Sequence, residues 1–376
     1  MAETVHLAER TPKVSAEDLL AGFHPSYRFG EVSFDTYIPD PQYPSQAEAV
    51  QQLRAFASSI KPRPGSGRGN GRGSGRDSSG GGLLGFLRGG KSASSKSTSS
   101  KAGKGTTAAT GVYLDGGFGV GKTHLLASTW HAAPGPKAFG TFVEYTNLVG
   151  ALSFRKTVDV LKEYTLVCID EFELDDPGDT VLMSRLMREL ADAGVKLVAT
   201  SNTLPGSLGE GRFAAQDFKR EIQVLADQFE VIRIDGEDYR HRGLADAPEP
   251  LADDQLRELA AERFPEADVV AEDDFTDLTA NLSRVHPSRY RKMVEDVDVM
   301  VLHHVETISE QAMALRFVVL ADRLYDKDVP VIASGVPFDQ LFTEEMMAGG
   351  YLKKYFRTIS RMTALVREGQ MGESGL

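Results

Sequence analysis

The chain has 376 residues, of which 41% are hydrophobic, and its formal net charge is −12. A chain of this size can bury a sizeable core and divide into two folded units. It has no run of about 18 apolar residues, and its N-terminus, MAETVHLAER, lacks the basic and then apolar pattern of a secretory signal. These features argue against a secreted or membrane-spanning protein, so we expect a cytoplasmic location.

Positive charge is concentrated in residues 61–107. This stretch carries ten Lys and Arg residues and one acidic residue, whereas the rest of the chain carries 32 basic and 53 acidic residues. It consists mainly of Gly, Ser, Lys and Arg, so we expect a disordered linker. An acidic body argues against a broad nucleic-acid-binding face, so any nucleic acid would bind only through residues 61–107. A plain flexible linker is the favoured interpretation of this stretch, and the alternatives are an arm that binds nucleic acid or anionic lipid and a docking peptide built on LLGFLRGG.

Strands and helices alternate from Gly111 onward. Apolar stretches predict strands over residues 111–116, 138–146, 164–170, 195–202 and 229–235. Helices are predicted over residues 122–133, up to about 163, over 179–194 and around 217–228. This alternation predicts an α/β fold, in which a parallel sheet has helices on both faces. In such sheets ligands bind beyond the carboxyl ends of the strands.

A glycine-rich motif follows the first of these strands. Residues 116–123, GGFGVGKT, match the phosphate-binding pattern G-x-x-x-x-G-K-[ST], directly before a predicted helix. Glycines allow backbone N–H groups to face phosphates, and the helix N-terminus adds its positive dipole end. We expect Lys122 to reach the outer phosphates of ATP and Thr123 to ligate Mg²⁺. The predicted nucleotide-binding residues are Gly116, Gly117, Phe118, Gly119, Val120, Gly121, Lys122, Thr123 and His124.

Polar residues end the third and fourth predicted strands. LVCIDE ends in Asp170, a candidate Mg²⁺ ligand, and in Glu171, a candidate to activate the water that attacks the γ-phosphate. Asn202 ends ATSN and is placed to hold that water or the γ-phosphate, although a turn-forming Asn is the alternative. The predicted catalytic residues are therefore Glu171, Asn202 and Lys122.

Longer motifs resemble the ZapE cell-division ATPases and their mitochondrial Afg-type relatives. They are DEFELDDPGDTVLMSRLMRELADAGVKLVATSNTLP, VIRIDGEDYRHR, ALRFVVLADRLYDKDVPVIAS and YFRTISRM. The resemblance covers roughly residues 20–60 and 108–370, and residues 61–107 are not part of the family pattern. It implies an AAA+-type, Mg²⁺-dependent ATPase that hydrolyses ATP to ADP and phosphate. It also implies a homo-oligomer that acts on a protein partner, in bacteria the FtsZ ring at the division site.

The resemblance also suggests residues of lower specificity. Arg212 and Arg220 lie where AAA+ proteins place a finger that enters the neighbouring subunit, and Arg316 is a candidate second sensor. The arginine that the family carries after its SN.PP motif has no clean match, and a solvated or structural arginine is the alternative in each case. Candidates for an adenine pocket, with ordinary packing as the alternative, are Phe34, Tyr37 and Gln46. Residues assigned only to the core or surface are Tyr325, Arg357 and Arg361.

Five regions are predicted along the chain. They are an N-terminal segment near the nucleotide (1–60), the linker (61–107), the ATPase core (108–243), an acidic connector (244–275) and a C-terminal α/β, lid-like region (276–376). Within the last region, strands are predicted at 298–305 and 329–335 on either side of a helix. The helix over residues 309–326 and the strand over 329–335 loosely echo residues 181–202, with two unrelated helix-strand units as the alternative.

Two other functions remain open from the sequence. GVGKTHLL also resembles replication initiators and helicase loaders, which are AAA+ proteins that act on DNA. The chain could alternatively be a nucleotide-gated switch with little turnover, which would not need Glu171.

Overall fold

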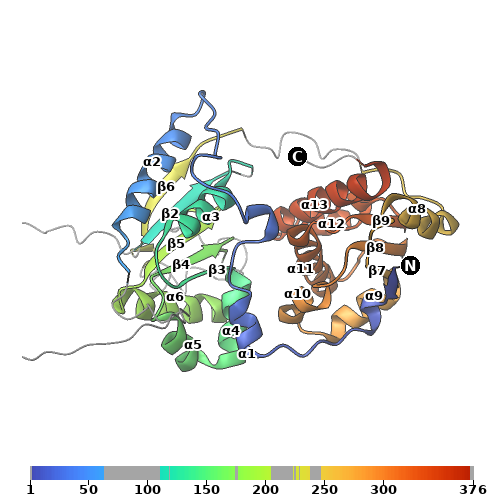
Figure 1. Cartoon of the computed structure of the whole chain (residues 1–376), viewed down its shortest axis with the longest axis horizontal. Helices are drawn as coiled ribbons and strands as arrows, with labels where there is room; N and C mark the ends of the chain where they lie inside the picture. The colour runs from blue at the N-terminus through green and yellow to red at the C-terminus, as the bar shows by residue number, and fades with distance from the viewer. Residues whose placement is uncertain are drawn as a thin grey trace, which may run out of the picture.

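The computed structural model describes residues 2–62, 111–117, 119–173, 177–204, 223, 226–227, 229–237 and 247–372. These form two α/β units side by side, each built on its own parallel sheet (Figure 1). We call residues 111–237 the first unit and residues 247–372 the second unit. Phe118, Arg212, Arg220 and nearly all of the basic stretch lie outside the described residues. Within them, no helix is long and apolar enough to cross a membrane.

The first unit contains a five-stranded sheet with the order β3-β4-β5-β2-β6. All its neighbouring strands run parallel. The strands are β2 (Gly111–Gly116), β3 (Lys137–Thr141), β4 (Leu166–Asp170), β5 (Lys196–Ser201) and β6 (Phe229–Ile234). Buried apolar clusters lie on both faces of this sheet, as the near-continuous apolar strands require. The predicted α/β fold with a parallel sheet is confirmed.

Helices connect these strands and cover the sheet. They are α3 (Lys122–Ala132), α4 (Phe142–Leu152), α5 (Phe154–Leu161) and α6 (Pro177–Asp192). The predicted strand over residues 138–146 is too long, because Thr141 and Glu144 form a capping box that begins α4. Strand β3 therefore ends at Thr141, at the same edge of the sheet as Asp170 of β4.

The second unit contains a four-stranded parallel sheet with the order β1-β7-β8-β9. Its strands are β1 (Glu3–Val5), β7 (Val269–Asp274), β8 (Val299–Val305) and β9 (Val331–Gly335). Its helices are α8 (Leu256–Arg263), α9 (Phe275–Arg284), α10 (Tyr290–Met293), α11 (Gln311–Lys327), α12 (Glu344–Met347) and α13 (Leu352–Met371). Its large apolar core lies beneath α9, α11 and α13.

The segment expected as an acidic connector differs from its prediction, because residues 256–274 fold into α8 and β7. Two acidic residues are buried within β7. Glu272 pairs with Arg257 and His303, and Asp273 accepts hydrogen bonds from the N–H groups of Leu7 and Ala8. Carboxylates can be buried in a strand when they have polar partners. The sequence VVAEDD does not show which partners it has, so it predicts a polar connector and not a buried strand.

The second unit repeats part of the first. Apart from the additional short helices α5 and α10, the order β7-α9-β8-α11-β9 matches β3-α4-β4-α6-β5, and the three strands neighbour one another in the same order. Glu171 and His304 have φ angles of 53° and 52°, an uncommon conformation for residues other than glycine. Their N–H groups donate to the hydroxyls of Thr200 (3.1 Å) and Ser334 (2.9 Å) on the next strand. The echo in the sequence thus reflects two similar backbone frameworks.

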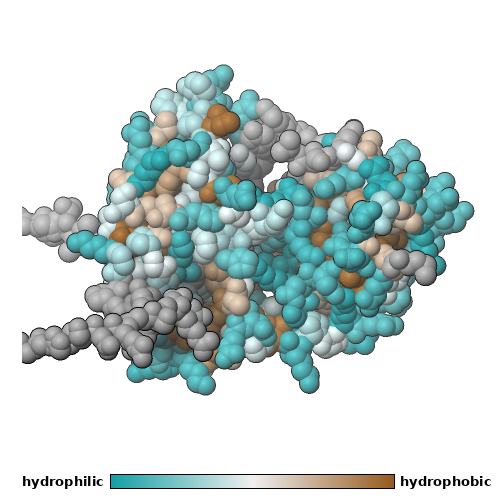
Figure 2. Space-filling model, viewed as in Figure 1, coloured by the Kyte–Doolittle hydropathy of each residue, from teal (hydrophilic) through white to brown (hydrophobic). Residues whose placement is uncertain are grey.

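The N-terminal segment contacts both units in turn. Its first strand, β1, joins the second sheet, and the 3-10 helix η1 (Leu7–Glu9) packs on α9. Helix α1 (Ala16–Ala21) then packs on α4, and the 3-10 helix η2 (Tyr27–Phe29) packs on α11. Finally α2 (Pro44–Ser59) packs on α3 and β6. On the face shown in Figure 2, hydrophilic residues cover most of both units.

Candidate functional site

The phosphate-loop sequence forms a tight turn between β2 and α3. Gly119 and Gly121 have φ angles of 77° and 81°, which side chains disfavour. A Cβ atom at Gly121 would also lie 2.4 Å from the ring of Tyr37. Lys122 follows as the first residue of α3, so the N-terminus of this helix points toward the loop. This is the backbone arrangement that binds phosphate groups.

Lys122 connects the loop to the tip of β5. Its Nζ atom donates to the carbonyl oxygens of Gly116 (2.9 Å) and Gly117 (2.6 Å) and to Oδ1 of Asn202 (2.7 Å). Burial lowers the pKa of Lys122 to about 8, although the carboxylate of Asp170 opposes that shift. The predicted lysine and asparagine therefore lie at one point on the carboxyl edge of the sheet.

Asp170 lies beside the start of α3. Its Oδ1 atom accepts a hydrogen bond from the hydroxyl of Thr123 (3.3 Å) and another from the hydroxyl of Thr200. A hydroxyl and a carboxylate oxygen are ligands that suit Mg²⁺, which usually keeps several waters and takes phosphate oxygens as further ligands. The described residues contain no group of three or more His, Cys, Asp or Glu side chains able to hold a metal. Thr123 and Asp170 thus fit a Mg²⁺ ion shared with a nucleotide.

Glu171 faces arginines of the second unit. Its Oε2 atom lies 2.7 Å from Nη1 of Arg357, and its Oε1 atom lies 3.6 Å from Nη2 of Arg361. Burial raises the pKa of Glu171 to about 7, and the two guanidinium groups limit that rise. The same two arginines pair with Asp322 of α11, at 2.9 Å in the case of Arg357.

These arginines belong to a stripe of cations on α13. Lys353, Arg357 and Arg361 are four residues apart, which places them on one face of the helix. Nζ of Lys353 lies 3.4 Å from the backbone oxygen of Asn202. Sequence reasoning missed this stripe because it assigned Arg357 and Arg361 to the core or surface. The four-residue spacing was the available signal, but only the fold shows which residues the stripe faces.

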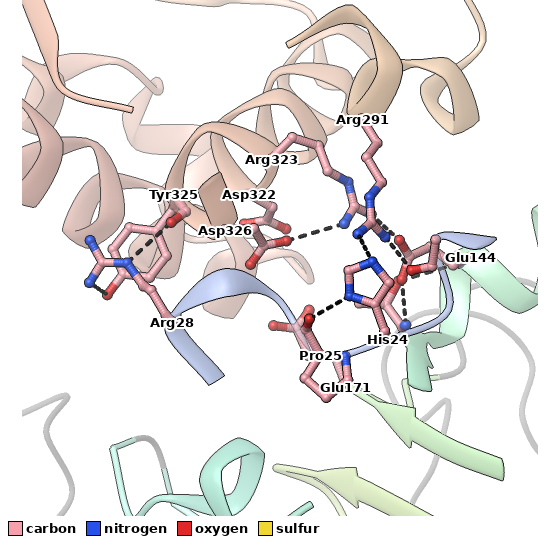
Figure 3. Close-up of polar contacts among 12 residues, drawn as sticks. His24, Pro25, Arg28, Glu144, Glu171, Arg291, Asp322, Arg323, Tyr325 and Asp326 are labelled. Carbon is pink, nitrogen blue, oxygen red and sulfur yellow. Dashed lines mark hydrogen bonds and ion pairs between the residues drawn. The ribbon is translucent and has the colours of Figure 1, made fainter. Parts of the chain in front are cut away.

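The two units enclose a cleft of about 1580 Å³, lined by Lys122, Thr123, Asp170, Glu171 and Asn202 of the first unit and by Arg357 and Arg361 of the second. Small-molecule pockets usually measure about 300–1,000 Å³, so a nucleotide fits. Further polar contacts bridge the cleft (Figure 3). Arg323 of α11 pairs with Glu144 of α4 at 3.0 Å and with Asp326 of its own helix at 3.2 Å.

The other predicted site residues lie around the phosphate loop and the cleft. His124 contacts the N-terminal segment, with Nε2 3.0 Å from the hydroxyl of Thr36. The hydroxyl of Tyr37 donates to the carbonyl oxygen of Val120 (2.8 Å). Phe34 is buried in the core under α2, and the amide of Gln46 donates to the carbonyl oxygen of residue 235 (2.9 Å). All three adenine-pocket candidates thus lie near the phosphate loop or β6.

Arg316 is placed differently from the catalytic candidates. Its Nη1 atom donates to the carbonyl oxygens of Leu282 (2.7 Å) and Val285 (2.9 Å), both in the second unit. The residue lines the cleft, but its guanidinium group binds backbone carbonyl oxygens at the C-terminal end of α9. The second-unit arginines that pair with Glu171 are Arg357 and Arg361.

A phosphate loop, an Asp-Glu pair and an asparagine on the carboxyl edge of one parallel sheet define the class of P-loop nucleotide-binding proteins. The sequence profile described as AFG1-like ATPase matches residues 87–266 and 247–372. The chain belongs to the AFG1-like ATPase family, and the family predicted from the sequence motifs is confirmed.

Similar proteins include the cell division protein ZapE of Escherichia coli K12. It is 29% identical over 308 residues, with 69% of this chain and 78% of that protein covered. Lactation elevated protein 1 homolog B of Danio rerio is 25% identical over 229 residues, with 52% of this chain and 45% of that protein covered. Among solved structures, AMPPCP-bound DnaA from Aquifex aeolicus matches with a TM-score of 0.35 and 11% identity, covering 57% of this chain and 52% of that one.

Proposed function

We propose that this protein is a Mg²⁺-dependent ATPase that hydrolyses ATP to ADP and phosphate and thereby acts on a protein partner. One observation carries the proposal: the chain brings to one edge of one sheet the side chains of Lys122, Thr123, Asp170, Glu171 and Asn202. Two of them begin α3, Asp170 ends β4, and Glu171 and Asn202 directly follow β4 and β5. Membership of an ATPase family supports the same activity.

Each of these residues has a separate role in the proposed hydrolysis of ATP. The ammonium of Lys122 exchanges its backbone partners for phosphate oxygens of ATP. Asn202 orients a water molecule whose oxygen bonds to the γ-phosphorus. The bond from that phosphorus to the bridging oxygen breaks, ADP leaves with the electron pair, and a water proton passes to Glu171. Thr123 and Asp170 would hold Mg²⁺, which would supply positive charge against the phosphates of ATP.

The activity is tested by phosphate release from ATP in purified full-length protein. We expect Mg²⁺-dependent release that is lost in Lys122→Ala, because this lysine contacts phosphates in the ground state. Chelation with EDTA should stop release as well. Release that persists in Lys122→Ala after further purification would reject this site as its source.

The partner is proposed from the named relative, a bacterial cell division protein that is 29% identical. We propose that the protein acts on the FtsZ ring and is recruited to the division site. With Mg-ATP, the protein should co-sediment with FtsZ polymers and change their length or bundling. Lys122→Ala is the control, since it keeps the surface and loses the nucleotide. Co-sedimentation that is absent, or equal with and without ATP, would reject this partner while leaving the ATPase proposal intact.

A further inference from the structure

The second unit presents charge to the reacting end of the proposed ATP site. Lys353, Arg357 and Arg361 lie on one face of α13, and that face meets the tips of β4 and β5. Arg357 and Arg361 reach Glu171, and Lys353 reaches the backbone of Asn202. Three cations thus converge on the two residues proposed to handle the attacking water.

We propose that Arg357 and Arg361 are catalytic residues of the ATPase site, supplied by the second unit of the same chain. The inference rests on the proposed function, ATP hydrolysis at the phosphate loop. The transferred phosphoryl group carries negative charge on three oxygens in the transition state, and a planar guanidinium group matches that charge with paired N–H donors. A site completed in this way does not need an arginine from a neighbouring subunit.

The geometry around Arg357 supports a phosphate-binding role. Its Nε atom is buried and has no hydrogen-bond acceptor within the described part of the chain. Its two terminal nitrogens are shared between Glu171 and Asp322, at 2.7 and 2.9 Å. Asp322 therefore fixes the guanidinium from the side of the second unit, while the opposite side faces the first. A buried donor without an acceptor is unfavourable, and an incoming oxygen ligand would satisfy it.

Arg361 is held by the same kind of support. It pairs with Asp322, and its guanidinium carbon lies 5.0 Å from the centre of the Tyr325 ring. On the opposite side of the cleft it is 3.6 Å from Glu171, longer than a hydrogen bond. Asp322 and Tyr325 therefore orient Arg361, while its contact with Glu171 is too long to be a hydrogen bond.

Glu171 competes with the transferred phosphoryl group for these donors. Both arginines contact Glu171 here, and the oxygens of the phosphoryl group would take over the donors as negative charge spreads over them in the transition state. The alternative is a purely structural bridge of the kind that Arg323 and Glu144 make.

The first experiment separates catalysis from domain docking. Full-length Arg357→Ala and Arg361→Ala are compared with Arg367→Ala, which removes the same residue type from α13 but does not line the cleft. We expect kcat to fall about 10³-fold in the first two. Affinity for a fluorescent ATP analogue should change by no more than about threefold, because the contact is made in the transition state.

A second readout is trapping of Mg-ADP by aluminium fluoride, which mimics the phosphoryl group in transfer. Wild type and Arg367→Ala should form the complex, whereas Arg357→Ala and Arg361→Ala should not. If an alanine variant loses its native melting transition, Arg357→Lys and Arg361→Lys replace it, because lysine keeps the charge without the paired donors. Full kcat or normal trapping in the arginine variants would overturn the inference.

A mixing experiment tests whether the arginines act within one chain. Lys122→Ala lacks nucleotide binding but keeps Arg357, and Arg357→Ala keeps the phosphate loop. If Arg357 serves its own chain, an equimolar mixture stays inactive at every protein concentration. Recovered activity would show that the arginine serves a neighbouring chain and overturn the inference. Failure of the ATPase proposal is distinct, because wild-type protein would then show no Lys122-dependent release.

Discussion

The Nζ atom of Lys122 and the Oδ1 atom of Asn202 lie 2.7 Å apart, although one residue begins α3 and the other follows β5. This contact joins the residue expected to bind phosphate to the one expected to position water. Lys122→Ala should therefore abolish both ATP binding and turnover. Asn202→Ala should keep binding and lose about 10²-fold in kcat through misplacement of the water. Fluorescence titration and phosphate release measure the two effects, and loss of binding in both variants would contradict the division of roles.

Glu171→Gln should bind ATP and fail to hydrolyse it. Glutamine has the same shape but cannot accept the water proton, so kcat should fall by at least about 10²-fold. The measurements are single-turnover hydrolysis and ATP affinity. Asp159→Asn, on the exposed surface of α5, is the matched control and should keep wild-type kcat. Normal turnover in Glu171→Gln would favour a nucleotide-gated switch over an ATPase.

Two pH effects are expected, one on kcat/KM through Glu171 and one on ATP affinity through Lys122. Burial raises the pKa of Glu171 to about 7, so kcat/KM should rise as pH rises through that value and the base loses its proton. Burial lowers the pKa of Lys122 to about 8, so ATP affinity should fall as pH rises through that value and the ammonium is lost. In Glu171→Gln, ATP affinity should still fall as pH rises through about 8, because Lys122 is unchanged. Binding by this variant that is constant from pH 7 to about 9.5 would contradict the role of Lys122.

Asp322 should matter for stability. It pairs with Arg357 and Arg361 and is only 16% exposed, so Asp322→Asn leaves two arginines poorly compensated. We expect the free energy of unfolding to fall by about 3 kcal/mol. Glu189→Gln, which breaks the exposed pair with Arg185, should change it by less than about 0.5 kcal/mol. Urea unfolding of both variants measures the two losses of unfolding free energy. Equal losses would show that the Asp322 ion pairs contribute no more to stability than an exposed pair does.

Deletion of residues 61–107 should remove any affinity for DNA. The deletion takes away ten basic residues and one acidic residue, and the remaining chain is acidic. Because phosphate neutralisation drives nonspecific binding, both the affinity and its salt dependence should disappear. ATP hydrolysis should persist, since the phosphate loop and Glu171 lie outside the deletion. DNA that still binds the shortened protein and stimulates its ATPase would favour an activity like that of helicase loaders.

Local patterns explain how much could be predicted from the sequence. The phosphate loop and the Asp170-Glu171 pair were found because their spacing and flanking strands are continuous in the chain. Strand β7 was missed because Glu272 is buried by virtue of partners far away in sequence. Arg357 and Arg361 were missed for the same reason, since their contacts with Glu171 depend on how the two units face each other. Roles that arise from packing between distant segments carry little local signal.

The N-terminal segment packs alternately on the second unit and the first unit. It is attached to α9 through η1, to α4 through α1, to α11 through η2 and to α3 through α2. Any change in the width of the cleft must therefore alter the span of the intervening stretches, 10–15, 22–26 and 30–43. Strand β1, at the far edge of the second sheet, is in this way mechanically coupled to Tyr37, which holds the carbonyl of Val120 in the phosphate loop.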